Sequence, residues 1–146
     1  MQKHARGFTE VININTKILM TTSSLVLGLA GILALFAPDV LLAMPGTPLT
    51  NSSSVLIQLM GALYFSMALM NWTAKDSTIG GIYARPVSVG NFAHFLTGTL
   101  LLIRYQLSNE FNLSILLPLV VYAIFASLFY WLVFRHTGIS VDRKAR

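Results

Sequence analysis

The chain has 146 residues, of which 55% are hydrophobic and only 10% are charged. A soluble domain usually carries about 25% charged residues, so this composition excludes a protein whose surface mostly faces water. The length predicts a single domain. The net charge is +5, but the basic residues stand at the ends of apolar runs and form no single basic face, which argues against nucleic-acid binding. The chain has no cysteine, and this excludes disulfides, thiolate metal sites and cysteine nucleophiles.

The first apolar run follows a polar segment, 1–16, and spans about residues 17–37. It is longer than the apolar core of a signal peptide, which has about 7–15 residues, so we expect a membrane helix that is retained. The next segment, 38–54, contains prolines and a group of hydroxyl and amide side chains. It predicts a loop with a short interfacial segment at 40–44.

Three further apolar runs lie at about 55–74, 86–105 and 113–135. Each is about 20 residues long, which at 1.5 Å per residue gives roughly the 30 Å thickness of the hydrocarbon core of a membrane. Backbone polar groups in lipid must pair within the segment, so each run should be a helix. The sequence therefore predicts an all-α integral membrane protein that forms one domain over 1–146, as a four-helix antiparallel bundle with short connections.

The basic residues predict the orientation of these helices. With four crossings, both tails (1–16 and 136–146) and the middle loop share one side of the membrane. Of the basic residues in and between the runs, only Arg104 is then expected on the other side. Because positive charge concentrates on the cytoplasmic side, we expect both termini to be cytoplasmic.

Polar side chains at spacings of three and four residues line each run, as is typical of packing faces between membrane helices. Three of them, Asn71, Asn91 and His94, are unusual, because an amide or imidazole in hydrocarbon needs a partner or costs a few kcal/mol. Counting residues from the connections places Asn71 near the depth of Asn91, His94 near Ser66, and Asn91 near Ser127. The candidate polar or ligand-binding cluster therefore comprises Asn71, Asn91, His94, Ser66, Ser127 and Tyr64.

Two interpretations of this cluster stay open. It is a structural clamp whose members satisfy one another, or it is a pocket for a polar head group, a quinone-like molecule or a proton, since an ionisable residue inside a membrane points to function. Haem ligation by His94 lacks a second axial histidine within the apolar runs, and no residues have the spacing of zinc ligands. No acidic residue lies inside a run, so no nucleophile with a base and an orienting acid can be assembled. We expect no catalytic residue, no metal and no cofactor.

The connection between the second and third runs carries charges of both signs and the pair Gly80-Gly81, which predicts a flexible turn. Lys75, Arg85 and Tyr83 are candidates for docking lipid phosphates or a partner protein. The alternative is a plain connecting loop.

The segment GALYFSMALMNWTAKDSTIGGIYARPVSVGNFAHFLTG, together with the helix count, resembles a signature of small four-helix bacterial membrane proteins. In architecture these are similar to the DoxX-like group. The resemblance covers about residues 55–103 and implies a bacterial inner membrane. It transfers no functional residue.

These observations favour a non-enzymatic integral membrane protein. It would be an accessory or assembly subunit, or a small lipid- or quinone-type binding module, acting through the hairpin of the second and third runs. One alternative is a homo-oligomeric small transporter or channel, and another is a membrane redox or lipid-modifying enzyme centred on His94. The expected partners are membrane lipids and a membrane protein or a second copy of the chain, and not nucleic acid.

Overall fold

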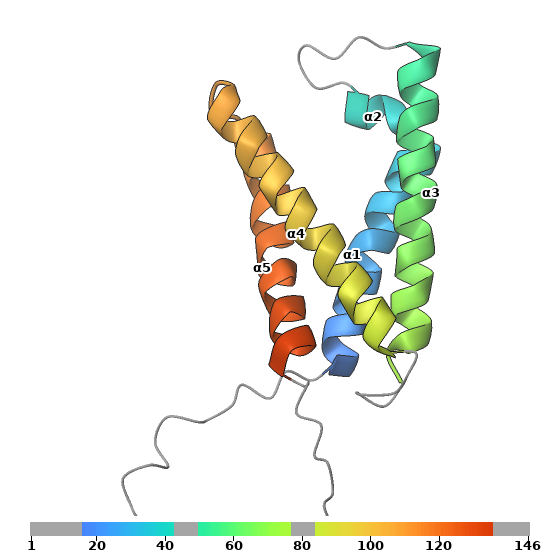
Figure 1. Ribbon diagram of the computed structural model, residues 1–146. Helices are drawn as coiled ribbons and strands as arrows, with labels where there is room; N and C mark the ends of the chain where they lie inside the picture. Colours follow the sequence, from blue (N-terminus) through green and yellow to red (C-terminus); the bar gives the residue numbers. More distant parts are fainter. Residues whose placement is uncertain (1–15, 43–49, 77–83, 136–146) are drawn as a thin grey trace, which may run out of the picture.

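The computed structural model describes residues 16–42, 50–76 and 84–135, and within these ranges every regular element is a helix. The helices are α1 (Thr16–Phe36), α2 (Pro38–Leu42), α3 (Asn51–Ala74), α4 (Ala84–Ser108) and α5 (Leu113–Arg135), as Figure 1 shows. All except the short α2 are long and apolar enough to cross a membrane. The all-helical class and the four spans predicted from the sequence are confirmed.

The start of α3 differs from the prediction, because the hydroxyl residues assigned to a loop form its first turn. Thr50 precedes the helix with an extended backbone, and its Oγ1 accepts a hydrogen bond of 3.1 Å from the backbone N–H of Ser53. Ser53 Oγ in turn accepts from the backbone N–H of Thr50 at 3.0 Å. This reciprocal capping box satisfies backbone donors that have no partner inside the helix, and so the helix begins at Asn51.

The long helices run antiparallel in chain order (Figure 1). The start of α1, the end of α3, the start of α4 and the end of α5 lie at one end of the molecule, called the tail end below. Lys17 and Asp76 form an ion pair there, with 2.7 Å between Nζ and Oδ1. The end of α1, the short α2, the start of α3 and the α4–α5 connection lie at the opposite end.

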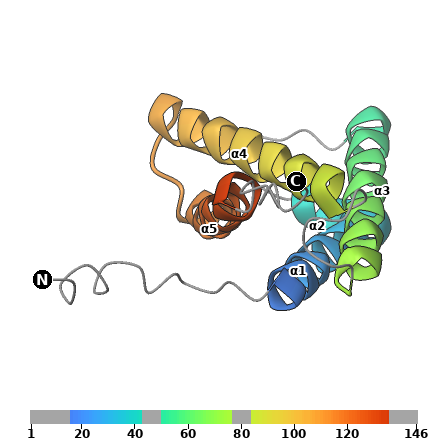
Figure 2. The ribbon, with the colours of Figure 1, turned by 60° about the horizontal axis from the view of Figure 1, so that its bottom comes forward.

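The four long helices follow the antiparallel order that the sequence predicts and are arranged as two hairpins. One hairpin packs α1 against α3 and the other packs α4 against α5, whereas the helix backbones of the two hairpins come close to each other at few positions. Figures 1 and 2 show that α3 and α4 approach each other at the tail end and diverge toward the opposite end.

The α1–α3 hairpin is held by close backbone approach. A Cβ atom added to Gly31 would lie 2.7 Å from the backbone nitrogen of Phe65, and one added to Gly61 would lie 2.9 Å from the carbonyl oxygen of Gly31. Ser24 Oγ also donates a 2.7 Å hydrogen bond to the carbonyl of Ala68. Membrane helices gain little from hiding apolar side chains from lipid, so such contacts between small residues carry their association.

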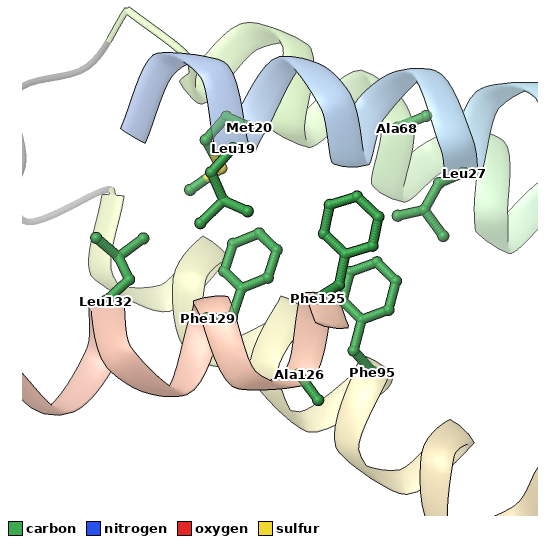
Figure 3. Close-up of a cluster of buried hydrophobic side chains, with 9 residues drawn as sticks. All are labelled: Leu19, Met20, Leu27, Ala68, Phe95, Phe125, Ala126, Phe129 and Leu132. Atoms are coloured by element: carbon green, nitrogen blue, oxygen red, sulfur yellow. The ribbon is translucent and has the colours of Figure 1, made fainter. Parts of the chain in front are cut away.

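The two hairpins meet in a core of apolar side chains near the tail end (Figure 3). Phe95 of α4 and Phe129 of α5 are both 0% exposed, and their rings stack with centroids 5.8 Å apart. All long helices contribute to this core, whose members are Leu19, Met20, Leu27, Ala68, Phe95, Phe125, Ala126, Phe129 and Leu132.

Candidate functional site

The first polar group joins the hairpins near the tail end. Asn71 of α3 and Asn91 of α4 are both 0% exposed. Asn71 Nδ2 donates to Asn91 Oδ1 at 2.8 Å, and Asn91 Nδ2 donates back to Asn71 Oδ1 at 2.6 Å. The sequence predicts that these two amides lie at one depth and contact each other, and in the structure they do.

A third residue, Ser23 of α1, completes this group, called the amide clamp below. Asn71 Nδ2 also donates to Ser23 Oγ at 3.0 Å, and Asn91 Nδ2 also donates to the carbonyl of Val87 at 2.8 Å. An asparagine amide has two N–H donors, so all four donors of the pair are used and both side-chain oxygens accept. The amide clamp is therefore saturated within the protein and offers no free donor for a ligand.

The sequence analysis missed Ser23. Its depth could not be read from the sequence alone: Ser23 follows Lys17 by about as many residues as Asn71 precedes Asp76, but only the structure shows that Lys17 and Asp76 pair. Two helices that run antiparallel from a common end bring such positions to the same depth.

The second polar group links three helices farther from the tail end. His94 Nε2 of α4 lies 3.2 Å from the hydroxyl oxygen of Tyr122 of α5. The Tyr122 hydroxyl donates to the hydroxyl oxygen of Tyr64 of α3 at 3.1 Å. The imidazole also meets the Tyr64 ring edge-on, with centroids 5.3 Å apart. We call Tyr64, His94 and Tyr122 the polar chain, and all three side chains are half-buried.

Glycine makes room for the polar chain. The ring of Tyr122 lies directly over Gly98 of α4, so closely that a Cβ atom at Gly98 would collide with it. The sequence analysis did not include Tyr122 among the site residues. The signal that points to it is a hydroxyl in the middle of an apolar run, because a buried tyrosine O–H usually finds a partner.

The depth of the polar chain follows from helix geometry. Tyr64 lies ten residues before the last residue of α3, and His94 lies ten residues after the first residue of α4. Ten residues of α-helix span about 15 Å, which is half of the roughly 30 Å hydrocarbon core. The polar chain therefore lies near the midplane of a membrane crossed by these helices.

Ser66 and Ser127 belong to neither polar group, and the expectation that they join the cluster is corrected. Both are exposed, and each hydroxyl donates to a carbonyl of its own helix at 2.8 Å, Ser66 to Ala62 and Ser127 to Ala123. Counting from the connections gives the depth of a residue but not its direction around the helix. Ser66 follows Tyr64 by two residues, which is a rotation of about 200° away from the Tyr64 face.

The candidate docking residues lie at the tail end. Lys75 places its Nζ 3.0 Å from the centroid of the Trp72 ring, a cation–π contact. Arg85 is exposed at the start of α4, and Tyr83 lies outside the described residues. The hydrogen bond from Lys17, together with its charge, lowers the pKa of Asp76 from its ordinary value of 3.8. The role of Lys75, Arg85 and Tyr83 in binding phosphates or a partner stays a prediction.

Within residues 16–42, 50–76 and 84–135, no three His, Cys, Asp or Glu side chains are grouped so that they could hold a metal ion. Comparison with family models, with curated proteins and with solved structures finds no match to this chain. Fold and site define its class: a helical protein with four helices able to span a membrane, whose hairpins are joined by a saturated amide clamp and a hydrogen-bonded polar chain.

Proposed function

We propose that this chain is a non-enzymatic, multi-pass protein of the bacterial inner membrane with both termini in the cytoplasm. It acts as a small module that binds a lipid- or quinone-type molecule, in an accessory or assembly role beside other membrane proteins. The charge distribution supports the orientation, because most basic residues belong to the tails and to the connection at the tail end.

The observation that carries the binding function is the polar chain at mid-membrane depth. The amide clamp satisfies all its own hydrogen bonds and serves as structure. The polar chain is different: within the described part of the chain, His94 Nδ1 has no hydrogen-bond partner, and neither does the hydrogen of the Tyr64 hydroxyl. Unmet polar atoms in hydrocarbon are costly, so a ligand that satisfies them gains affinity.

The depth of the polar chain restricts the ligand to molecules that dissolve in the membrane. A half-buried group about 15 Å from the membrane surface is reached from the acyl-chain region and not from water. A charged phospholipid head group is confined to the interface, whereas an uncharged head group on an apolar tail reaches this depth at low cost. Lys75 and Arg85 at the tail end provide a separate place for lipid phosphates in this proposal.

Native mass spectrometry of the full-length protein, released from nanodiscs that contain decyl-ubiquinone, tests the proposal. We expect a protein–ligand adduct for the wild type and a loss of the adduct for the double variant Tyr64→Phe/His94→Phe. The matched control is Ser66→Ala, on the same helix as Tyr64 but pointing away, which should keep the adduct. An adduct that survives the double variant would place binding elsewhere.

The same spectra separate this proposal from the alternatives. Release of the protein as a ring of several copies without bound ligand would favour the homo-oligomeric transporter or channel. Conversion of the added molecule, seen as a change in its mass, would favour an enzyme centred on His94.

A further inference from the structure

The contacts that join the two hairpins are gathered in the half of the molecule nearer the tail end. Asn71 of α3 and Asn91 of α4 exchange hydrogen bonds there, and Phe95 and Phe129 belong to the apolar core to which α1 also contributes. Figures 1 and 2 show α3 and α4 close together at this end and apart at the opposite end. The tail end therefore fastens one hairpin to the other.

Among the described residues, the hydrogen bond between the hairpins that lies farthest from the tail end is in the polar chain. The Tyr122 hydroxyl donates to the Tyr64 hydroxyl at 3.1 Å. Tyr64 lies seven residues before Asn71 on α3, which places this bond about 10 Å beyond the amide clamp. Beyond it, α3 continues for thirteen residues, and α4 continues for fourteen residues past His94, or about 20 Å each. The hydrogen bonds in these outer parts join described residues of the same hairpin.

The outer parts of α3 and α4 present apolar side chains that do not depend on the other hairpin. Met60, four residues before Tyr64 on the same face of α3, is 53% exposed. Leu101, seven residues after His94 on the same face of α4, is 66% exposed. Membrane helices gain little by hiding such side chains from lipid. Moving the outer parts farther apart therefore breaks little besides the Tyr64–Tyr122 hydrogen bond and the edge-on contact of Tyr64 with His94.

Tyr122 stays with its own hairpin when this hydrogen bond breaks. Its ring lies directly over Gly98 of α4, and its hydroxyl oxygen lies 3.2 Å from Nε2 of His94 on the same helix. A hydroxyl donates or accepts, so it bonds to the imidazole whichever ring nitrogen carries the hydrogen. The loss on separation falls on the single bond to Tyr64.

We infer that the two hairpins pivot about the tail end between a closed state, in which Tyr64 and Tyr122 are hydrogen-bonded, and an open state, in which they are not. The amide clamp and the apolar core persist in both states, so the hairpins stay joined. Opening exposes the Tyr64 hydroxyl to the acyl-chain region of the membrane. This inference goes beyond the proposed function, because the pivot needs no ligand.

Helix geometry predicts the size of the movement. Val55 of α3 and Leu107 of α4 each lie sixteen residues from the asparagine of the amide clamp on the same helix, or about 24 Å, compared with about 10 Å for Tyr64. A hydrogen bond is lost when its two oxygens move about 1–2 Å beyond their ordinary distance. Rigid helices that pivot at the amide clamp roughly double this displacement at Val55 and Leu107. We expect these two positions to separate by about 2–5 Å.

Double electron–electron resonance between spin labels at Val55→Cys and Leu107→Cys, in the full-length protein in nanodiscs, tests the pivot. Both positions are exposed, and the natural chain has no cysteine. Tyr64→Phe removes the hydroxyl and keeps the ring that contacts His94. We expect it to raise the ratio of long to short distances by about three- to tenfold, the effect of one such hydrogen bond. Tyr122→Phe removes the same bond from the other side and should give a similar shift, and the double variant should add little to either.

Two controls accompany the measurement. Tyr130→Phe removes a hydroxyl from a tyrosine of α5 that is 53% exposed, and it should leave the distances unchanged. Labels at Thr73→Cys and Val89→Cys, exposed positions two residues from the clamp asparagines, report on the pivot itself. Their distance should be the same with and without Tyr64→Phe.

Equal distances at the outer positions in the wild type and in Tyr64→Phe would overturn the inference, and so would an equal shift in Tyr130→Phe. A shift between Thr73 and Val89 as large as the outer one would also overturn it, because the hairpins would then separate as whole bodies. None of these outcomes bears on the adduct that tests the proposed function, so the two can fail independently.

Discussion

Asn71 and Asn91 stabilise the fold only while both are present, because each is the hydrogen-bond partner of the other. Asn71 and Asn91 exchange two hydrogen bonds in the amide clamp, so that neither exposes a polar atom to hydrocarbon. Removal of one partner leaves the other with unmet groups, and that loss exceeds the value of the bond itself. The pair therefore behaves as a unit in any substitution experiment.

Asn91→Leu should lower the free energy of unfolding by about 1–3 kcal/mol, the cost of leaving the buried Asn71 amide without its partner. The double variant Asn71→Leu/Asn91→Leu should lose less than the sum of the two single variants, because no unpaired amide remains. Unfolding in mixed detergent micelles, followed by circular dichroism, gives all the values. Strictly additive losses would show that the two amides do not act together.

Asp76 tests the ion pair at the tail end. The hydrogen bond from Lys17 holds the pKa of Asp76 below 3.8, so the carboxylate is stabilised in the folded state. The ion pair contributes to the stability of the fold at pH values above 3.8, where Asp76 is also ionised in the unfolded chain. This contribution is lost as the pH falls through the lower pKa that Asp76 has in the folded protein. Lys17→Met should return the pKa of Asp76 toward 3.8, measured by NMR titration of its carboxyl carbon. A pKa that is the same in both proteins would exclude the pair in solution.

At the scale of helices, the contact between α1 and α3 depends on the absence of two side chains. A Cβ atom at Gly61 would lie 2.8 Å from Cβ of Ala34 and 2.9 Å from backbone atoms of α1. Backbone atoms of a packed helix cannot move aside as a flexible side chain can. The helices would have to separate, and the contacts that hold the hairpin would be weakened along its length.

Gly61→Ala should therefore destabilise the protein by about 1–3 kcal/mol, as overpacking of a tight interface does. Gly90→Ala is the matched control, because a Cβ atom at Gly90 meets nothing within 4 Å. Alanine is the better helix former by about 0.5–1 kcal/mol, so the control should be neutral or slightly stabilising. Equal effects of the two substitutions would exclude close α1–α3 packing.

The sequence allowed the helices and one polar pair to be predicted, because length, hydropathy and depth are properties of a single run. Asn71 and Asn91 were matched by counting residues from their connection. The direction in which a side chain points depends on how neighbouring helices are rotated, and so the positions of Ser66 and Ser127 were wrong. Tyr122 meets His94 because Gly98 admits its ring, a condition that involves two helices at once. The divergence of the hairpins likewise depends on packing between segments distant in sequence.

At the scale of the whole molecule, the antiparallel order places the tail ends of all four long helices together (Figure 1). This arrangement requires that the α3–α4 connection and both tails share one side of the membrane and that the α4–α5 connection lies on the other. The positive charge of the tail end supports the proposal that this side is cytoplasmic. The arrangement and the orientation are thus two separate statements that a single labelling experiment can address.

The natural chain has no cysteine, so a single introduced cysteine reports its own location without background. We expect Glu110→Cys, in the exposed α4–α5 connection, to react in intact cells with a maleimide that cannot cross the membrane. Asp76→Cys, exposed at the end of α3, and Lys144→Cys, in the C-terminal tail, should react only after the cells are opened. If Asp76→Cys and Lys144→Cys are labelled from outside while Glu110→Cys is protected, the arrangement stands and the orientation is reversed. If Asp76→Cys and Glu110→Cys are labelled from the same side, the helices do not cross the membrane in the order that the structure requires.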